Sequence, residues 1–245
     1  MARQLRAVSL KTATEEQRST KTFGCLGNTL LTVALLAGLF LVYQLWWTDI
    51  TADKEAASTA SAIRAAWKDA DAGKKEQLPG IGFLHVPTLG ETSELAVVEG
   101  TEPERLNEGV VGYYTTPVRS AMPWDSEGNF ALAAHRDGHG AKFHNLDKVK
   151  TGDNIIMETK DKWYIYKIFA TLPKTTEDDV GVVEPIPVGS GRHTRGRYIT
   201  LTTCTPVFTS DYRMVVWGEL IRVDAMDENR TPPPELRESD QSGPE

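Results

Sequence analysis

Residues 198–220 read YITLTTCTPVFTSDYRMVVWGEL, which predicts two β-strands joined by a turn. Proline cannot continue a central strand, so Pro206 places Cys204 at the end of the first strand, facing a loop. Arg213 starts the second strand. A turn between the strands would therefore bring Arg213 back beside Cys204.

Short β-rich segments of the same kind occur over most of the chain, separated by clusters of Gly, Pro and Asp. The candidate strands are 82–86, 94–98, 130–135, 154–158, 163–172, 198–203 and 214–223. One short helix is expected over 103–108. About eight strands in about 145 residues, without a long amphipathic helix, predict a mainly β domain over 78–224. We expect a closed or nearly closed β-barrel with short helices.

One uninterrupted apolar stretch precedes this domain. No charged residue occurs between Thr22 and Thr48, and residues 26–48 are long enough for one transmembrane helix, which needs about 20 residues. A cleaved signal peptide is the alternative, but its apolar core would be shorter, with a small-residue cut site. We therefore expect a retained signal anchor. Five basic and two acidic residues precede it, so the positive-inside rule predicts a cytoplasmic N-terminus and an extracellular domain.

The remaining segments differ in composition. Residues 1–25 are polar and form the predicted cytoplasmic tail. Residues 49–77 are rich in alanine and charge, which predicts a helical stalk ending near Gly73. Residues 225–245 contain three consecutive prolines, many acidic residues and almost nothing apolar, so a disordered tail is predicted there.

The overall composition excludes several classes of protein. Hydrophobic residues make up 40% of the 245 residues, which excludes a fully disordered chain. A net charge of -7 argues against a non-specific nucleic-acid binder, which needs a basic face. The two cysteines, Cys25 and Cys204, fall on opposite sides of a predicted bilayer whose apolar core is about 30 Å thick. They cannot form one disulfide, so Cys204 is an unpaired thiol.

The position of Cys204 at a strand end favours a role as a catalytic nucleophile, although an unpaired cysteine is often only a buried packing residue. A nucleophilic thiol needs a nearby base or cation to populate its thiolate. His135 follows the apolar run Phe-Ala-Leu-Ala-Ala and opens a loop, so it also lies at a strand end and is expected to meet Cys204. Arg213 is the candidate cation, with a solvated strand-end arginine as the simpler interpretation.

Three histidines within ten residues raise the question of a metal site. His135, His139 and His144 flank Asp137, but they lie in a glycine-containing loop without the helical i, i+4 spacing of common ligand pairs. The sequence also contains no glycine-rich phosphate-binding motif. We therefore predict no metal and no cofactor.

The cysteine and histidine segments resemble those of the sortase family of cysteine transpeptidases. Thr-Leu-Thr-Thr-Cys-Thr-Pro, residues 200–206, with Arg213 downstream, is similar to the sortase signature T-L-x-T-C and its arginine. Asn-Phe-Ala-Leu-Ala-Ala-His-Arg, residues 129–136, resembles the family's histidine segment, and the likeness covers 78–224. The N-terminal anchor and the form of the cysteine motif look most like class E, the actinobacterial housekeeping type.

The departures from the family are modest. Ala134 stands where glycine is usual, His139 stands where an aromatic residue is common, and residues 124–126 replace a glycine-containing turn. These positions affect the expected groove more than the expected triad. The acidic run Glu177-Asp178-Asp179 is similar to a Ca²⁺ site of some sortases, but a solvated loop is the preferred interpretation.

The resemblance implies a reaction and its partners. Sortases cut a sorting signal of the L-P-x-T-G type, or L-A-x-T-G in class E, between Thr and Gly. Cys204 would attack the Thr carbonyl, Arg213 would stabilise the oxyanion or hold the peptide, and His135 would protonate the departing amine. The resulting thioester would pass to a peptidoglycan precursor amine. The implied partners are surface proteins that carry the signal, and the implied location is the outer side of the cell membrane.

The resemblance also implies residues of a substrate groove. Thr202 and Thr203 are expected to line it, although threonine is ordinary in strands. Tyr114 matches a class E tyrosine that is linked to alanine at the second signal position, with Tyr113 as the competing match. The loop 173–197 is long for a hairpin and is expected to form a groove wall.

Other functions remain open. An L,D-transpeptidase would carry the signature S-x-G-C-x-R, and a papain-like protease would place its cysteine before its histidine, so both are disfavoured. A pilin-type sortase is disfavoured because no Asp-Pro-aromatic lid motif precedes the domain. A non-catalytic wall-binding scaffold would tolerate loss of the cysteine, histidine and arginine, and all three are present.

Overall fold

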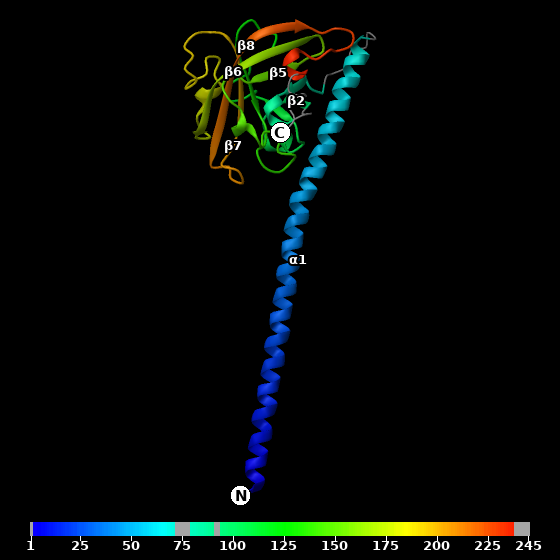
Figure 1. Cartoon of the computed structure of the whole chain (residues 1–245), viewed down its shortest axis with the longest axis vertical. Coiled ribbons are helices and arrows are strands. Elements are labelled where there is room, and N and C mark those ends of the chain that lie inside the picture. The colour runs from blue at the N-terminus through cyan, green and yellow to red at the C-terminus, as the bar shows by residue number, and fades with distance from the viewer. Residues whose placement is uncertain (1, 72–78, 91–93, 238–245) are drawn as a thin grey trace. The chain divides into compact units, whose positions relative to one another are not determined.

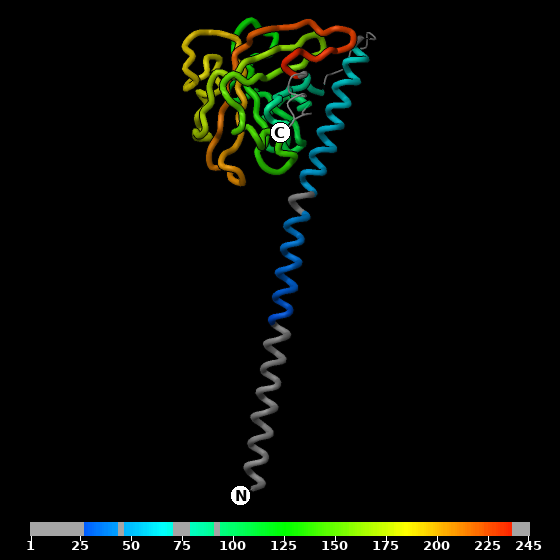
Figure 2. Tube along the Cα trace, viewed as in Figure 1, coloured from blue at the N-terminus to red at the C-terminus, as the bar shows by residue number. Residues whose placement is uncertain are grey.

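The structure is a computed structural model. It describes residues 2–71, 79–90 and 94–237, with side chains of the first helix described over 27–43 and 47–70. The chain forms two compact units, Met1–Trp47 and Thr48–Glu245. All eight strands of the described residues belong to the second unit. Figure 1 draws strands as arrows and helices as coiled ribbons, and Figure 2 traces the same chain as a tube.

The second unit is built on one closed β-barrel. Its strands are β1 (Gly82–His85), β2 (Leu95–Glu99), β3 (Val111–Tyr113), β4 (Gly128–Ala133), β5 (Asn154–Glu158), β6 (Lys162–Thr175), β7 (Arg197–Thr205) and β8 (Tyr212–Ala225). Their order around the barrel is β1-β2-β3-β4-β7-β8-β6-β5, and β5 pairs with β1 to close it. The predicted closed barrel of about eight strands is confirmed. Strand β3, with three residues, was missed because it is too short to show alternation.

Short helices occupy the connections between strands. They are η1 (Pro87–Leu89), α2 (Pro103–Leu106), η2 (Leu146–Lys148), η3 (Val180–Val183) and α3 (Pro234–Arg237). Helix α2 falls within the predicted range 103–108 and begins with a proline, which has no N–H to leave unpaired in the first turn. It leads directly into the loop before β3.

Alternation along the strands separates an inner face of the barrel from an outer face. Phe130 and Leu132 of β4, and Ile199 and Leu201 of β7, belong to the main core, to which every other strand also contributes. The intervening positions of β4, β7 and β8 therefore lie on the outer face. Cys204 is one of these outer positions.

Two strand pairings bring the predicted triad to one edge of the barrel. Strands β4 and β7 are parallel, with Ala133 opposite Thr202, so both strands end at the same edge. Strands β7 and β8 are antiparallel, with Cys204 opposite Arg213, so β8 begins where β7 ends. The predicted turn that returns the arginine to the cysteine is therefore present.

Helix α1 (Ala2–Asp71) runs through the predicted anchor and the predicted stalk. Its portion Gly27–Ala70 includes a window with a mean hydropathy of 1.9, none of it buried, which is long and apolar enough to cross a membrane. This agrees by length and composition with the anchor predicted over 26–48. In the second unit, Ile63 and Trp67 of α1 pack against β1 and β2 in a separate apolar cluster.

Some predicted segments lie outside the described residues. These are the predicted end of the stalk near Gly73 and the side chains of the cytoplasmic tail, residues 1–25. The last eight residues of the chain are also outside the described part.

The described part of the predicted disordered tail, 225–237, makes several contacts with the barrel. Arg230 donates hydrogen bonds to Glu158 Oε1 (2.7 Å) and to the Thr159 carbonyl (2.8 Å). Leu236 packs against a small apolar cluster on β5 and β6. The composition of this segment does not predict these contacts, because a charged residue such as Arg230 is expected to be solvated, whereas here it is paired with a buried carboxylate.

Candidate active site

The candidate nucleophile, Cys204, lies near the end of β7 on the outer face of the barrel. Its side chain is half-buried and its thiol is free. Thr200 and Thr202 precede it on the same face, because side chains two residues apart in a strand point the same way. Arg213 lies directly opposite it on β8. The strand end expected from Pro206 therefore presents a thiol beside a guanidinium group.

His135 reaches the same edge from β4. The residue before it, Ala134, is tied to β7 by two hydrogen bonds: its carbonyl accepts from the Thr203 hydroxyl (2.8 Å), and its N–H donates to the Thr202 carbonyl (3.3 Å). These bonds continue the β4–β7 pairing beyond Ala133. Extending that parallel register by two residues sets His135 opposite Cys204. The structure therefore brings together all three residues of the predicted triad.

The imidazole of His135 is oriented by a residue that the sequence analysis did not single out. His135 Nε2 lies 2.8 Å from Asn107 Oδ1, at the end of α2. A carboxamide oxygen only accepts, so Nε2 donates in this contact and Nδ1 stays available for proton transfer. Asn107 lies 28 residues from His135 along the chain, and no local pattern marks it.

The surroundings of His135 favour its neutral form. Burial of the imidazole, and then the positive charge that His139 can carry, lower the pKa of His135 below its usual 6.5. The two imidazole rings lie 5.5 Å apart. A lowered pKa means that only a minor part of His135 is protonated at neutral pH, so a role as general acid depends on that fraction.

The guanidinium of Arg213 is held by three oxygen atoms. Nη1 donates to the carbonyls of Ser210 (2.8 Å) and Tyr212 (3.2 Å), and Nη2 lies 3.1 Å from Glu177 Oε2. The two carbonyls fix the cation at the start of β8. Glu177 comes from the acidic run that the sequence analysis interpreted as a solvated loop, so its contact with Arg213 was missed.

Tyr114 and Thr202 meet on the outer face next to the triad. The Thr202 hydroxyl donates to the Leu132 carbonyl (3.1 Å), so the Tyr114 hydroxyl is the donor in their 2.9 Å contact. Burial raises the pKa of Tyr114, so the phenol stays neutral and keeps its donor proton. Tyr113 instead interacts with Glu99. Of the two competing tyrosines, the structure places Tyr114 at the site.

Thr203 does not face this site. Its neighbours at two-residue spacing, Leu201 and Ile199, belong to the inner core, and Thr203 is itself buried with its hydroxyl bonded to Ala134. The alternation of apolar residues in β7 could have predicted this placement. Thr202 is therefore the member of the pair that lines the outer face.

The connection between β6 and β7 folds over the outer face of the sheet. Trp217 Nε1 donates to the Val182 carbonyl (3.0 Å), and Asn129 Nδ2 donates to the Glu184 carbonyl (2.9 Å). Val182 and Val183 of η3 are buried against β4 and β8. These contacts make this part of the loop 173–197 a wall beside the face that carries Thr202.

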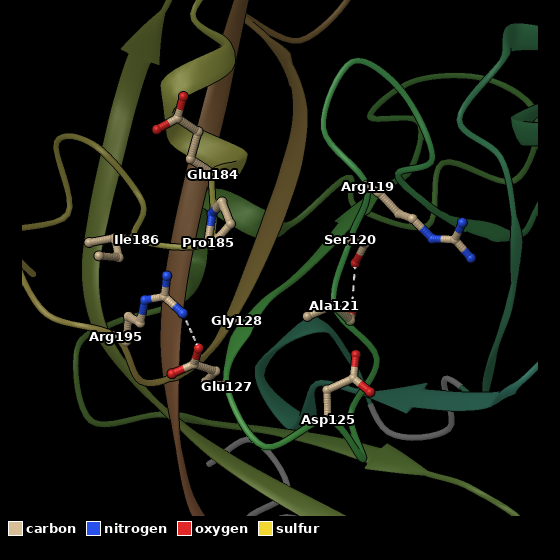
Figure 3. A pocket seen from close by; sticks show the side chains of 10 residues that line it. All are labelled: Arg119, Ser120, Ala121, Asp125, Glu127, Gly128, Glu184, Pro185, Ile186 and Arg195. Atoms are coloured by element: carbon tan, nitrogen blue, oxygen red, sulfur yellow. Dashed lines mark hydrogen bonds and ion pairs between the residues drawn. The ribbon is translucent and has the colours of Figure 1, made fainter.

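A separate pocket of about 570 Å³ lies near the start of β4, between the loop before that strand and the loop 184–195 (Figure 3). Its lining carries both charge signs, including the ion pair between Arg195 and Glu127. Gly128, which lines it, precedes His135 by seven residues, roughly 23 Å of strand at 3.3 Å per residue. The lining contains no thiol or imidazole, in contrast to the barrel edge that carries Cys204 and His135.

The structure shows how the three histidines raised above as candidate metal ligands are placed. Among the described residues, no group of three or more His, Cys, Asp or Glu side chains is placed to hold a metal ion. Instead, His135 contacts Asn107, and His144 Nδ1 lies 2.9 Å from the Arg136 carbonyl oxygen. His135 and His144 therefore bind different partners, and the ring of His139 lies 5.5 Å from that of His135.

Comparisons with known proteins agree with this geometry. The chain matches the sortase domain family over residues 84–221. It is 52% identical over 221 residues to Sortase SrtE2 of Streptomyces coelicolor, covering 86% of this chain and 87% of that protein. It is 42% identical over 200 residues to Sortase SrtE1 of the same organism, covering 80% of this chain and 56% of that protein.

Solved structures of sortase E share the barrel. The crystal structure of sortase E1 from Streptomyces coelicolor, with a tripeptide in its active site, has a TM-score of 0.59 at 41% identity and covers 64% of this chain and 96% of that chain. Sortase E from Streptomyces avermitilis has a TM-score of 0.56 at 35% identity and covers 64% of this chain and 98% of that chain. The family match spans more than half of the chain and includes both strand ends described above. The chain therefore belongs to the sortase family and is a class E sortase, a transpeptidase.

Proposed function

We propose that this sortase cleaves a sorting signal of the L-A-x-T-G or L-P-x-T-G type between Thr and Gly and transfers the protein to a cell-wall amine. The observation that carries the proposal is the convergence of His135, Cys204 and Arg213 at one barrel edge. Thiol, imidazole and guanidinium supply the nucleophile, the acid and the oxyanion partner that acyl transfer requires.

In the first half of the reaction, the Cys204 thiolate attacks the Thr carbonyl carbon and forms an S–C bond. Arg213 donates to the oxyanion, and its hold on the Ser210 carbonyl leaves the guanidinium little to reorganise. Protonated His135 gives its proton to the Gly nitrogen as the C–N bond breaks. The products are a thioester on Cys204 and the released glycine peptide.

In the second half, an amine from a peptidoglycan precursor attacks the thioester carbonyl. His135, now neutral, accepts the proton of that amine, and the Cys204 thiolate leaves. The new amide joins the surface protein to the wall. The hydrogen bond to Asn107 keeps the imidazole in one orientation for both transfers.

We infer that the signal peptide lies along the outer face between Cys204 and the wall formed by η3. Tyr114 and Thr202 lie on this face, and Val215, opposite Thr202 on β8, is buried beneath Val182 and Val183 and so supports the wall from below. A closely packed face that carries one phenol suits a small side chain such as alanine at the second signal position. We therefore propose a preference for L-A-x-T-G.

We further propose that residues 26–48 anchor the protein in the cell membrane with the catalytic domain outside. The uncharged stretch and the basic residues before it support this orientation. Protease added to intact cells should then remove the domain. If the domain is protected in intact cells and is cleaved only after lysis, the catalytic domain lies inside the cell and the proposed orientation is wrong.

The function can be tested with the full-length protein in detergent micelles. Quenched peptides with L-A-x-T-G and L-P-x-T-G are incubated with an amine acceptor, alongside a Cys204→Ala variant. Cleavage and ligation that disappear in Cys204→Ala support the proposal, and the faster peptide sets the preference. An acyl-enzyme trapped at Cys204 and identified by mass supports the thioester.

Two negative results have different meanings. Failure to turn over either peptide, together with a Cys204 that does not react with a thiol reagent, would favour a non-catalytic scaffold. Failure with a reactive Cys204 would mean that the chemistry is present and the signal is different. A folded Cys204→Ala variant that still cleaves would refute the assignment of the nucleophile.

A further inference from the structure

The part of α1 that directly follows the predicted anchor reaches the loops around His135. This post-anchor segment, residues 49–53, belongs to the second compact unit together with the barrel. It contacts the loop after β4 on one side and the loop after α2 on the other. Both loops carry groups that contact the His135 imidazole.

The first contact is with the loop after β4. Asp49 Oδ1 accepts a hydrogen bond from the Gly140 N–H (3.0 Å), and Asp53 Oδ1 lies 2.8 Å from Lys142 Nζ. Both partners belong to the short stretch that starts at His135. Two carboxylates one helical turn apart therefore hold the backbone and a side chain of this loop.

That loop has a backbone that needs such support. Four successive residues, Gly138, His139, Gly140 and Ala141, have φ angles of 64°, 48°, 75° and 37°. Left-handed conformations are unfavourable for residues other than glycine, so they persist only where contacts enforce them. The loop closes on His135 through the Phe143 N–H, which donates to the His135 carbonyl (3.0 Å). A change in loop shape would therefore move the imidazole.

The second contact is with the loop after α2. Ala52 of the post-anchor segment is buried, and a Cβ added to Gly109 would lie 2.8 Å from the Ala52 carbonyl oxygen. Gly109 has a φ of +71°, so glycine fits both the conformation and the close approach. Two residues earlier, Asn107 accepts the hydrogen bond of His135 Nε2. One turn of α1 thus contacts both loops next to the imidazole: the loop after β4, and the loop after α2 that follows Asn107.

We propose that Asp49 and Asp53 are positioning residues for His135, so that the segment leaving the predicted anchor is part of the active-site scaffold. The proposal rests on the proposed function, in which His135 transfers the proton. The contacts of both carboxylates are with the loop after β4, whereas the proposed groove lies on β7 and β8. Loss of the two carboxylates is therefore expected to lower kcat and leave KM unchanged.

The test compares variants of the full-length protein in detergent micelles. Asp49→Ala/Asp53→Ala removes both contacts, and kcat should fall by about tenfold, because small displacements of a catalytic group are costly in rate. Asp49→Asn keeps an acceptor oxygen for Gly140 and should retain most of the activity. Glu55→Ala removes an exposed acidic residue of the same helix and serves as the matched control. Its kcat should equal that of the wild type.

A second readout separates positioning from general loss of structure. The pKa of His135, followed by NMR of its ring proton, should move toward the usual 6.5 in the double variant as the imidazole becomes more exposed. The rate at which Cys204 reacts with a small thiol reagent, and the unfolding temperature, should stay close to wild type. If the double variant does not fold, Lys142→Met breaks the Asp53 contact from the other side and should give a smaller loss of kcat.

The outcomes distinguish this proposal from the proposed function. Wild-type kcat together with an unchanged His135 pKa in the double variant would overturn the positioning role. If the wild type itself cleaves no signal peptide, the proposed function fails, and the His135 titration alone still decides whether the two carboxylates position the imidazole.

Discussion

Glu177 and Arg213 form an ion pair at the edge of the active site, with Oε2 3.1 Å from Nη2. The side chain of Glu177 is 71% exposed, whereas that of Arg213 is 25% exposed and also bound by two backbone carbonyls. The Glu177 carboxylate therefore binds one N–H group of Arg213, the residue that is proposed to donate hydrogen bonds to the oxyanion. An oxyanion that approaches Nη2 therefore meets the negative charge of Glu177 beside it, which opposes its binding.

Glu177→Gln should raise kcat/KM toward signal peptides by up to about fivefold at low salt. Exposed ion pairs contribute about 1 kcal/mol or less, which sets the upper limit of the gain. The gain should shrink as salt screens the pair. Asp178→Asn removes a neighbouring charge and is the control. A fall in kcat/KM for Glu177→Gln would instead mean that the carboxylate holds Arg213 in its productive position.

Tyr114→Phe should reduce the preference for alanine over proline at the second signal position by about fivefold. The change removes one hydrogen bond, worth about 1 kcal/mol, and leaves the Thr202 hydroxyl bonded to the Leu132 carbonyl. The measurement is the ratio of kcat/KM for L-A-x-T-G and L-P-x-T-G peptides. Tyr113→Phe makes the same chemical change beside the site and should leave that ratio unaltered.

His139→Asn should raise the pKa of His135. Asparagine tolerates the positive φ at this position, and the change removes the second cause of the lowered pKa while burial remains. Protonated His135 is lost as pH rises through its pKa, so a higher pKa moves the alkaline limb of the kcat/KM profile to higher pH. NMR titration of the ring proton checks the shift directly, with His193→Asn as control. If the pKa of His135 does not change, burial alone accounts for its lowered value.

Glu158 should make folding stability sensitive to acid. Burial opposes its ionisation, but hydrogen bonds from His85, Arg64 and Arg230 outweigh burial and lower the pKa of Glu158 to about 2, against 4.5 unfolded. A depressed carboxyl pKa adds stability above the unfolded value, and this stability is lost as pH falls from about 4.5 to about 2. The difference corresponds to about 3 kcal/mol.

Chemical unfolding followed by tryptophan fluorescence can measure this contribution. The wild type should lose most of its stability advantage over Glu158→Gln between about pH 5 and pH 2. An advantage that does not change over this range would show that the carboxylate is not stabilised by its three partners. Glu94→Gln, on the exposed side of Arg64, is the control and should show little pH-dependent difference.

Local patterns in the sequence were enough to predict the barrel, the triad and the apolar anchor candidate. Alternation marked the strands, Pro206 ended β7 after Cys204, and the short turn returned Arg213 to it. Such signals come from neighbouring residues, whose steric and hydrophobic preferences act over a few positions. The same alternation also predicts that Thr203 faces the inside of the barrel and not the expected groove.

Contacts between residues that are distant in the sequence could be identified only from the folded chain. Asn107 meets His135 across 28 residues, and Arg64 meets Glu158 across 94, because closure of the barrel brings separate elements together. The contact between Asp49 and Gly140 spans 91 residues and depends on how one helix packs on that barrel. Likewise, the pairing of Arg230 with the buried Glu158 is a contact that the composition of the tail does not predict. Local patterns cannot specify these contacts, since each one requires two segments that only the complete fold places side by side.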